Sequence, residues 1–127
     1  MSNSSGLVSK KTVVIGASPN PERYAYVATQ RLRRAGHEVV AVGLRAGKVG
    51  DVELRTDRPA VPEVDTVTLY VGPQHQPAWQ DYILSLRPKR IIFNPGTENP
   101  QLESAAEALG IVTEEACTLV MLSTGSY

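Results

Sequence analysis

Residues 12–26, T-V-V-I-G-A-S-P-N-P-E-R-Y-A-Y, decide how this 127-residue chain folds. The first four of them form a β-branched run, which is typical of a strand covered on both faces. Gly16 ends the run, because without a side chain it takes backbone angles that other residues avoid and lets a ligand approach the main chain. Ser18 or Asn20 is expected to cap a following helix, with Pro21 at its first position. The stretch therefore predicts a buried strand, a tight loop and the start of a helix.

The start of that helix is a candidate phosphate site. Its unpaired N–H groups and the positive end of its dipole would point at the loop, where a phosphate is stabilised. Arg23 would be unfavourable beside that dipole, and a bound anion would offset the repulsion. The dinucleotide fingerprint G-x-G-x-x-G is absent, because the stretch holds one glycine. On spacing alone, an ordinary strand-to-helix turn that binds nothing is an equal alternative.

Composition excludes several classes of protein. A chain of 127 residues with 42% hydrophobic content predicts one compact domain over residues 11–127, preceded by a flexible polar tail at residues 1–10. Thirteen basic residues balance thirteen acidic ones, so no global field recruits nucleic acid or an anionic membrane. The apolar runs are too short to span a bilayer. One cysteine excludes an intrachain disulfide, and without an apolar leader we expect a cytoplasmic protein.

Further along the chain, strands and helices alternate. Strands are expected at residues 12–15, 39–42, 66–71, 90–93 and 111–113, with a small extended piece near 52–54. Helices are expected at residues 22–35, 77–86 and 101–109, and a short one within 115–122. This alternation predicts an α/β fold with an open, mainly parallel five-stranded sheet and helices on both faces.

The pattern also makes expectations about packing. Tyr24, Val27, Ala28, Leu32 and Ala35 fall on or near one stripe of the first helix and are expected to face the sheet. In the second helix, the inward residues would be Trp79, Ile83 and Leu86. His37 precedes the second strand and is expected at the surface, on the edge opposite the ligand. Residues 125–127 are expected to fray.

In such sheets, ligands bind beyond the carboxyl ends of the strands, where the strand order reverses. Four loops qualify, at residues 16–22, 43–50, 72–76 and 94–99, and each is rich in Gly, Pro or Asn. Enzymes that use an unphosphorylated nicotinamide cofactor place a carboxylate after the second strand. This chain has Arg45 and Lys48 there, which would attract an extra ribose phosphate, as in coenzyme A or NADP. Solvated loop charge is the alternative explanation of both cations.

Several of these segments together carry a family resemblance. They are V-V-I-G-A-S-P-N-P-E-R-Y-A-Y, G-K-V-G, Y-V-G-P, I-I-F-N-P-G-T-E-N and E-E-A-C-T-L-V-M-L. In this order they resemble the small stand-alone CoA-binding proteins, which are similar to the CoA-binding domain of the succinyl-CoA synthetase alpha subunit. The resemblance covers about residues 11–122 and has a G-A-S-x-x-P-x-R core. It implies a Rossmann-like fold and coenzyme A as the ligand.

The resemblance also implies where the ligand lies. The CoA phosphates would contact Gly16, Ala17 and Ser18, with Arg23 alongside. The adenosine end would lie near Val42–Arg45 and Lys48, and Val71–Pro73 would wall the nucleotide. One departure concerns the adenosine end, because many members have a Pro-Val-Asn-Pro type segment where this chain has A-V-G-L-R. The phosphorylated histidine of the synthetase lies outside this domain, so its activity is not implied here.

Taken together, these inferences name a set of cofactor-binding residues. They are Gly16, Ala17, Ser18, Asn20, Arg23, Tyr24, Val42, Gly43, Leu44, Arg45, Lys48, Val71, Gly72, Pro73, Asn94, Pro95 and Gly96.

Catalytic groups are scarce by comparison. His75 stands in the third loop and Cys117 follows the fifth strand, but no Ser, Cys or carboxylate is spaced to form a relay with His75. Cys117 is more simply a buried packing residue than a reactive thiol. Two distant histidines and one cysteine do not make a metal site.

The expected function is therefore a CoA or acyl-CoA binding protein that senses or carries its ligand. The alternative is an NADP-dependent or acyl-CoA-linked enzyme on the same fold. The apolar segment near the C-terminus would cover either the domain's own core or a second subunit in a homodimer.

Overall fold

The computed structural model describes residues 9–127 as seven strands and four helices. In chain order the elements are β1 (Thr12–Ala17), α1 (Tyr24–Arg34), β2 (Val39–Gly43), β3 (Gly47–Val49), β4 (Val52–Arg55), β5 (Thr66–Leu69), α2 (Pro77–Ser85), β6 (Arg90–Phe93), α3 (Pro100–Ala108), β7 (Val112–Glu115) and α4 (Thr118–Thr124). The expected tail at residues 1–10 falls largely outside the described part of the chain.

The strands form a single sheet in the order β3-β4-β2-β1-β5-β6-β7. All neighbouring pairs are parallel except β3 and β4, which pair antiparallel. The predicted α/β class and mainly parallel sheet are confirmed, but the count of five strands is wrong. The expected extended piece is β4, and β3 folds back on it through the turn at Gly50 and Asp51. This hairpin extends the sheet beyond β2.

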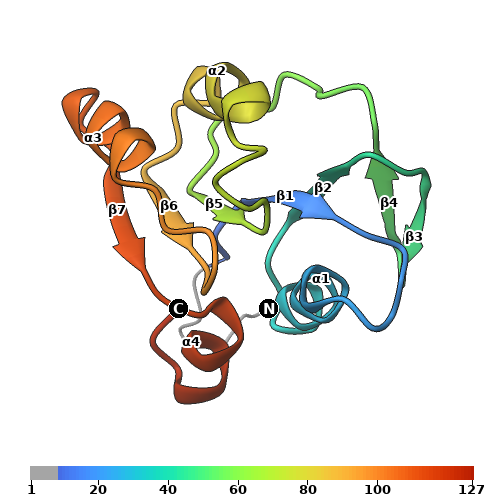
Figure 1. Ribbon diagram of the computed structural model, residues 1–127. Helices are drawn as coiled ribbons and strands as arrows, with labels where there is room; N and C mark the ends of the chain where they lie inside the picture. Colours follow the sequence, from blue (N-terminus) through green and yellow to red (C-terminus); the bar gives the residue numbers. More distant parts are fainter. Residues whose placement is uncertain (1–8) are drawn as a thin grey trace.

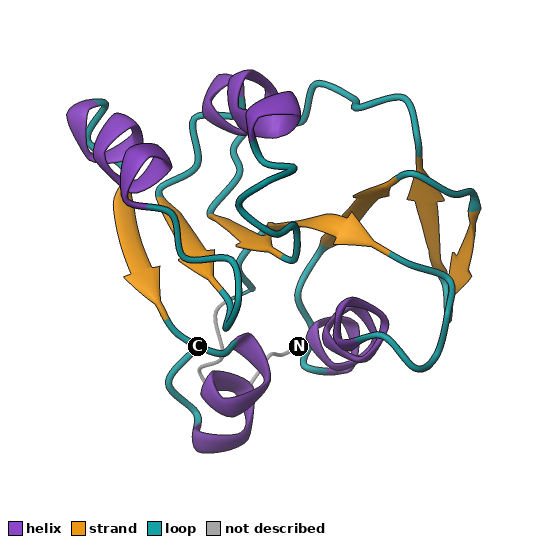
Figure 2. Cartoon of the chain, viewed as in Figure 1, coloured by secondary structure: helices purple, strands orange, loops and turns teal. Residues whose placement is uncertain are grey.

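Helices cover both faces of the sheet, as Figures 1 and 2 show. On one face, Trp79 and Ile83 of α2 and Leu102 of α3 pack against Ile15 of β1 and Phe93 of β6. On the other face, α1 and α4 cover a second cluster that contains Val14 and Ala41. Because both faces are covered, β1, β5 and β6 are almost entirely buried, which explains their continuous apolar and β-branched sequences. The inward positions of Trp79, Ile83 and Leu86 are confirmed.

The strand order reverses at β1. The chain leaves β1 through α1 and reaches β2 on one side, whereas it leaves β5 through α2 and reaches β6 on the other. Since α1 and α2 lie on opposite faces (Figure 1), the carboxyl ends of β1 and β5 mark the switch point at which ligands bind in such sheets. The residues that follow these two strands are therefore the first place to look for a site.

Helix α1 begins later than expected. It starts at Tyr24 with Arg23 as N-cap, so neither Ser18 nor Asn20 caps it and Pro21 is not its first residue. Asn20 instead accepts a hydrogen bond from Glu22 N–H at 3.0 Å, which closes a turn ahead of the helix. The buried residues of α1 are Ala25, Ala28, Thr29 and Leu32. The expected inward positions of Tyr24 and Ala35 are wrong, because both residues are exposed.

Two expectations at the opposite edge of the sheet are also wrong. His37 is 8% exposed rather than a surface residue, although it does lie at the amino ends of the strands. Tyr127 does not fray, because its ring lies 5.0 Å from that of His37 and its hydroxyl lies 2.6 Å from Thr12 Oγ1. The guanidinium of Arg90 stacks on the same ring at 4.7 Å. The C-terminal residue thus closes the core at the edge away from the switch point.

Within residues 9–127, no helix combines the length and the apolar character needed to cross a membrane.

Candidate functional site

The end of β1 packs directly against the end of β5. Gly16 has φ +90°, and a Cβ there would lie 2.8 Å from Tyr70 O and 2.9 Å from Val71 Cγ2. Tyr70 N–H donates to Ile15 O at 2.8 Å, which fixes the two strand ends together. A residue with a side chain would have to push these loops apart. Gly16 therefore permits the close approach of the ends of β1 and β5.

The loops after β1 and β2 are packed just as closely. Ala17 is the register partner of Gly43, and a Cβ on Gly43 would overlap Ala17 O. A Cβ on Gly47 would lie 2.7 Å from Pro19 Cβ. The structure thus brings the first two predicted ligand loops into contact. Val42, expected at the adenosine end, is fully buried beneath them.

The start of α1 presents a positive helix end without a compensating side chain. Its N-cap residue, Arg23, makes no side-chain capping bond, and no acidic residue stands in the first turn. The polar side chains of the preceding loop form hydrogen bonds within that loop. Ser18 Oγ accepts a hydrogen bond from Asn20 N–H at 3.1 Å. Arg23 N–H in turn donates to Asn20 O at 3.0 Å. The loop is therefore braced internally, and the positive end of the helix is left for an anion.

Two cations, Arg23 and Arg45, stand in the loops of this half of the edge, whereas Lys48 lies lower in the sheet, opposite Glu53 of β4. Arg23, Arg45 and Lys48 are all exposed, and within the described residues none of them forms an ion pair or a side-chain hydrogen bond. Lys48 lies opposite Glu53 across the β3–β4 hairpin, yet no ion pair joins the two. Exposed apolar side chains stand among the cations, because Tyr24 is 75% and Leu44 83% exposed. Anionic groups and a flat ring could both be accommodated here.

The other half of the edge is formed by the loops after β5 and β6. Val71 and Gly72 are partly buried, and Pro73, Pro95 and Gly96 are exposed. Asn94 is 1% exposed and its amide is fully engaged. Its Nδ2 donates to Thr68 Oγ1 at 2.7 Å and to Leu69 O at 2.9 Å, and its Oδ1 accepts from Thr118 N–H at 2.9 Å. Asn94 thus links the end of β6 to β5 and to the start of α4, beneath this half of the edge.

A second buried side-chain amide in this region, that of Gln76, was not predicted from the sequence. Gln76 is 0% exposed, and its Nε2 donates to Val71 O at 2.8 Å and to Thr97 O at 2.7 Å. Its Oε1 accepts from Asn99 Nδ2 at 2.7 Å, while Asn99 Oδ1 caps α3. Nothing in the sequence signals this role, because a glutamine in a loop before proline is usually solvated.

The two candidate reactive groups stand apart from one another. His75 is exposed in the turn after Gly72. Cys117 is the partly buried N-cap residue of α4 and lies near Tyr70. Burial, with Cys117 as a smaller contribution, raises the pKa of Tyr70, whose hydroxyl has no hydrogen-bond partner in the described chain. No group of metal-ligating side chains forms within residues 9–127.

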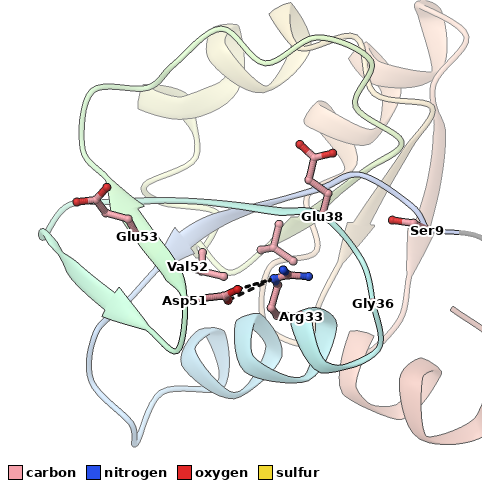
Figure 3. Close-up of a pocket in the computed structure, with 8 residues that line it drawn as sticks. Ser9, Arg33, Gly36, Glu38, Asp51, Val52 and Glu53 are labelled. Atoms are coloured by element: carbon pink, nitrogen blue, oxygen red, sulfur yellow. Dashed lines mark hydrogen bonds and ion pairs between the residues drawn. The ribbon is translucent and has the colours of Figure 1, made fainter. Parts of the chain in front are cut away.

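A pocket of about 350 Å³ lies elsewhere, at the amino ends of β2 and β4 (Figure 3). Its lining includes Glu38, Asp51 and Glu53, and the Arg33 guanidinium is held by Asp51 at 3.2 Å. Three carboxylates against one paired cation would repel a phosphorylated ligand. The site that suits an anion is therefore the edge at the carboxyl ends of the strands.

Comparison with known proteins identifies the family. A family model described as a CoA binding domain matches residues 10–123. The chain belongs to this CoA-binding domain family. The match spans β1 to α4 and includes all four predicted ligand loops. The resemblance inferred from the sequence segments is thereby confirmed.

Solved structures share the fold of this CoA-binding domain. A crystal structure of an uncharacterized protein is 50% identical, with a TM-score of 0.92, and the match covers 95% of this chain and 100% of that one. A hypothetical protein from Pyrococcus horikoshii OT3 is 23% identical over 91% of this chain and 83% of its own, with a TM-score of 0.81. A Thermus thermophilus protein is 22% identical over 94% and 91%, with a TM-score of 0.80. The comparison with curated proteins gives no match.

Proposed function

We propose that this protein binds CoA or an acyl-CoA at the carboxyl edge of its sheet. The observation that carries the proposal is the CoA-binding domain match, because it spans the whole edge from the Gly16 loop to α4. The local geometry supports it. A bare positive helix end and the unpaired cations Arg23 and Arg45 lie at the switch point of the sheet.

In the proposed complex, the pyrophosphate lies against Gly16, Ala17 and Ser18 at the start of α1. Arg23 approaches it from the N-cap position, where a guanidinium is stabilised only if an anion is present. Val71–Pro73 would wall the nucleotide from the β5 side, since this loop already touches Gly16.

The adenosine end would lie over the β2 end and the β3–β4 hairpin. Arg45 and Lys48 would pair with the ribose phosphate, and the exposed side chains of Tyr24 and Leu44 would offer the adenine apolar surface. A ligand without that phosphate would leave both cations unused. CoA should therefore bind more tightly than dephospho-CoA.

We infer a sensing or carrier role rather than catalysis. His75 is exposed, and in the described chain no side chain hydrogen-bonds to it or orients it. An acid–base or nucleophilic centre needs such a partner within hydrogen-bond reach. The bound state would be passed on through a protein partner or a homodimer.

Ligand titration tests this proposal. A ligand that binds only the folded protein raises its thermal stability by mass action, so CoA should raise Tm and dephospho-CoA should raise it less. Stabilisation by NADP without stabilisation by CoA would contradict the proposal and favour the enzyme alternative. Native mass spectrometry of the purified protein would show a co-purified CoA species and the subunit count together.

A further inference from the structure

The loops after β5 and β6 are joined by a side chain and not by the sheet. The register between the two strands ends at Leu69 and Phe93, and beyond these residues no described backbone hydrogen bond links the loops. Gln76 makes the connection, because its Nε2 donates to Val71 O on one loop and to Thr97 O on the other. Asn94 ties the base of the β6 loop to Leu69 O, and above that level Gln76 is the side chain that links the two loops within the described residues.

This amide is held in place on both of its sides. Its two N–H donors are used by the two carbonyls, and its Oε1 accepts from Asn99 Nδ2 at 2.7 Å. Asn99 is itself fixed, since its Oδ1 caps α3 and its N–H donates to Glu103 Oε2 at 3.2 Å. With no exposed surface, Gln76 cannot exchange these bonds for water. Replacing it would remove the partners of Val71 O, which is partly buried, and of Thr97 O, which is buried.

The position of the two loops connects Gln76 to the ligand. In the proposed complex the adenosine lies toward β2, so the pantetheine arm leaves the pyrophosphate on the opposite side, toward β5 and β6. Neighbouring strands are about 4.8 Å apart, and an arm as long as four extended residues reaches on the order of 14 Å. An arm running along the edge therefore passes the β5 loop and then the β6 loop.

We propose that Gln76 is a positioning residue that holds these two loops at the separation required by the pantetheine arm of CoA. The inference rests on the proposed function and adds a residue that need not touch the ligand. The nucleotide half is held mainly by the β1 and β2 loops, and it meets the β5 loop only at Val71–Pro73, whose contact with Gly16 does not involve Gln76. Gln76 should therefore matter much less for adenosine 3′,5′-bisphosphate, which lacks the arm.

The test measures dissociation constants of CoA and of adenosine 3′,5′-bisphosphate by calorimetry for Gln76→Ala. We expect the affinity for CoA to fall about tenfold, the effect of losing one net hydrogen bond, and the affinity for the bisphosphate to change little. Thr12→Val is the matched control. Thr12 is equally buried and hydrogen-bonded, but it lies at the opposite edge. This variant should lose stability without losing affinity for either ligand.

Asn99→Ser covers the case in which Gln76→Ala does not fold. Serine keeps the cap of α3 and removes only the bond to Gln76, so we expect a smaller loss that is again selective for CoA. Equal losses for both ligands, or unchanged CoA affinity in the folded variants, would overturn the inference. If the wild-type chain binds CoA but the variants show equal losses or unchanged CoA affinity, the proposed function stands and only the role of Gln76 is rejected. If the wild-type chain does not bind CoA, the proposed function fails first and this inference fails with it.

Discussion

At the scale of single residues, the close contact between the ends of β1 and β5 requires that residue 16 is a glycine, which has no side chain. Gly16 and Gly36 have almost the same backbone angle, with φ of +90° and +93°. Their surroundings differ, because a Cβ on Gly16 meets the β5 backbone at 2.8 Å whereas a Cβ on Gly36 meets nothing within 4 Å. Substituting each glycine in turn therefore separates two losses of stability, one from backbone strain and one from moving the β5 loop.

We expect Gly36→Ala to lower the free energy of unfolding by about 1 kcal/mol, the lower end of the range for strain of this kind. Gly16→Ala should lose more, because a backbone carbonyl must also move, and it should weaken CoA binding. Chemical denaturation and calorimetric titration would measure the two effects. Equal stability losses, or full CoA affinity in Gly16→Ala, would show that the contact between β1 and β5 does not shape the site.

The second residue-scale prediction concerns Arg23. Its side chain is exposed and makes no hydrogen bond in the described chain, so Arg23→Ala should leave stability nearly unchanged. CoA affinity should fall by about 1.5–3 kcal/mol, the range for a hydrogen bond to a charged group. Arg34→Ala, an exposed arginine at the other end of α1, is the control and should bind CoA normally. A calorimetric titration that shows equal affinities would remove Arg23 from the site.

Residue types explain which parts of the site were predictable. Gly16 and Arg23 could be singled out as candidates because a glycine after a buried strand and a cation at a helix start each have a local physical cost, and their contact with a ligand stays a prediction. Asn94 and Gln76 could not be understood in the same way. Their roles come from carbonyls and amides that are distant in the sequence, such as Thr97 O and Thr118 N–H.

At the scale of elements, the β3–β4 hairpin extends the sheet beyond β2. The sequence between its strands is V-G-D-V, and a Gly-Asp pair between two apolar residues is a hairpin signal. A glycine-rich loop was expected over residues 43–50, so β3 was missed. The late start of α1 has a related cause. Asn20 uses its side chain for a turn before the helix, and sequence alone does not separate a turn from a cap.

The hairpin gives a prediction about ligand selectivity. In Arg45→Ala and Lys48→Ala, affinity for CoA should fall while affinity for dephospho-CoA stays the same, because only CoA carries the ribose phosphate. The CoA affinity of the wild type should also fall as salt rises, since both cations are exposed and screened. Competition binding with the two ligands measures this. If both ligands lose affinity equally, the cations do not contact the ribose phosphate.

At the scale of the whole molecule, the alternation of strands and helices was enough to predict a parallel sheet with two covered faces. The contact between Tyr127 and His37 was not predictable, because it joins the last residue to a position 90 residues earlier and no local pattern marks it. The buried His37 ring still has a measurable consequence. Burial, helped by the nearby Lys10 and Arg90 cations and opposed by Asp65, lowers the pKa of His37.

This shift gives stability a defined pH dependence. His37 Nδ1 accepts from Lys10 N–H at 2.9 Å, so the native state resists protonation more than the unfolded chain does. The unfolded chain binds the proton first, near the ordinary histidine value of about 6.5. Stability should therefore be full above that pH and fall as the pH drops toward the lower native pKa. In Tm measurements from pH 7.5 to about 5, His37→Asn should flatten this slope and the exposed control His75→Asn should not. An unchanged slope in His37→Asn would assign the acid sensitivity to other groups.

The most direct measurement is a crystal structure of the protein with CoA. We expect the pyrophosphate beside Gly16, Ala17 and Ser18 at the start of α1, with Arg23 in contact with it and the pantetheine arm directed toward the β6 loop. CoA bound in the pocket of Figure 3, or at any site away from the carboxyl ends of β1 and β5, would contradict the proposed function.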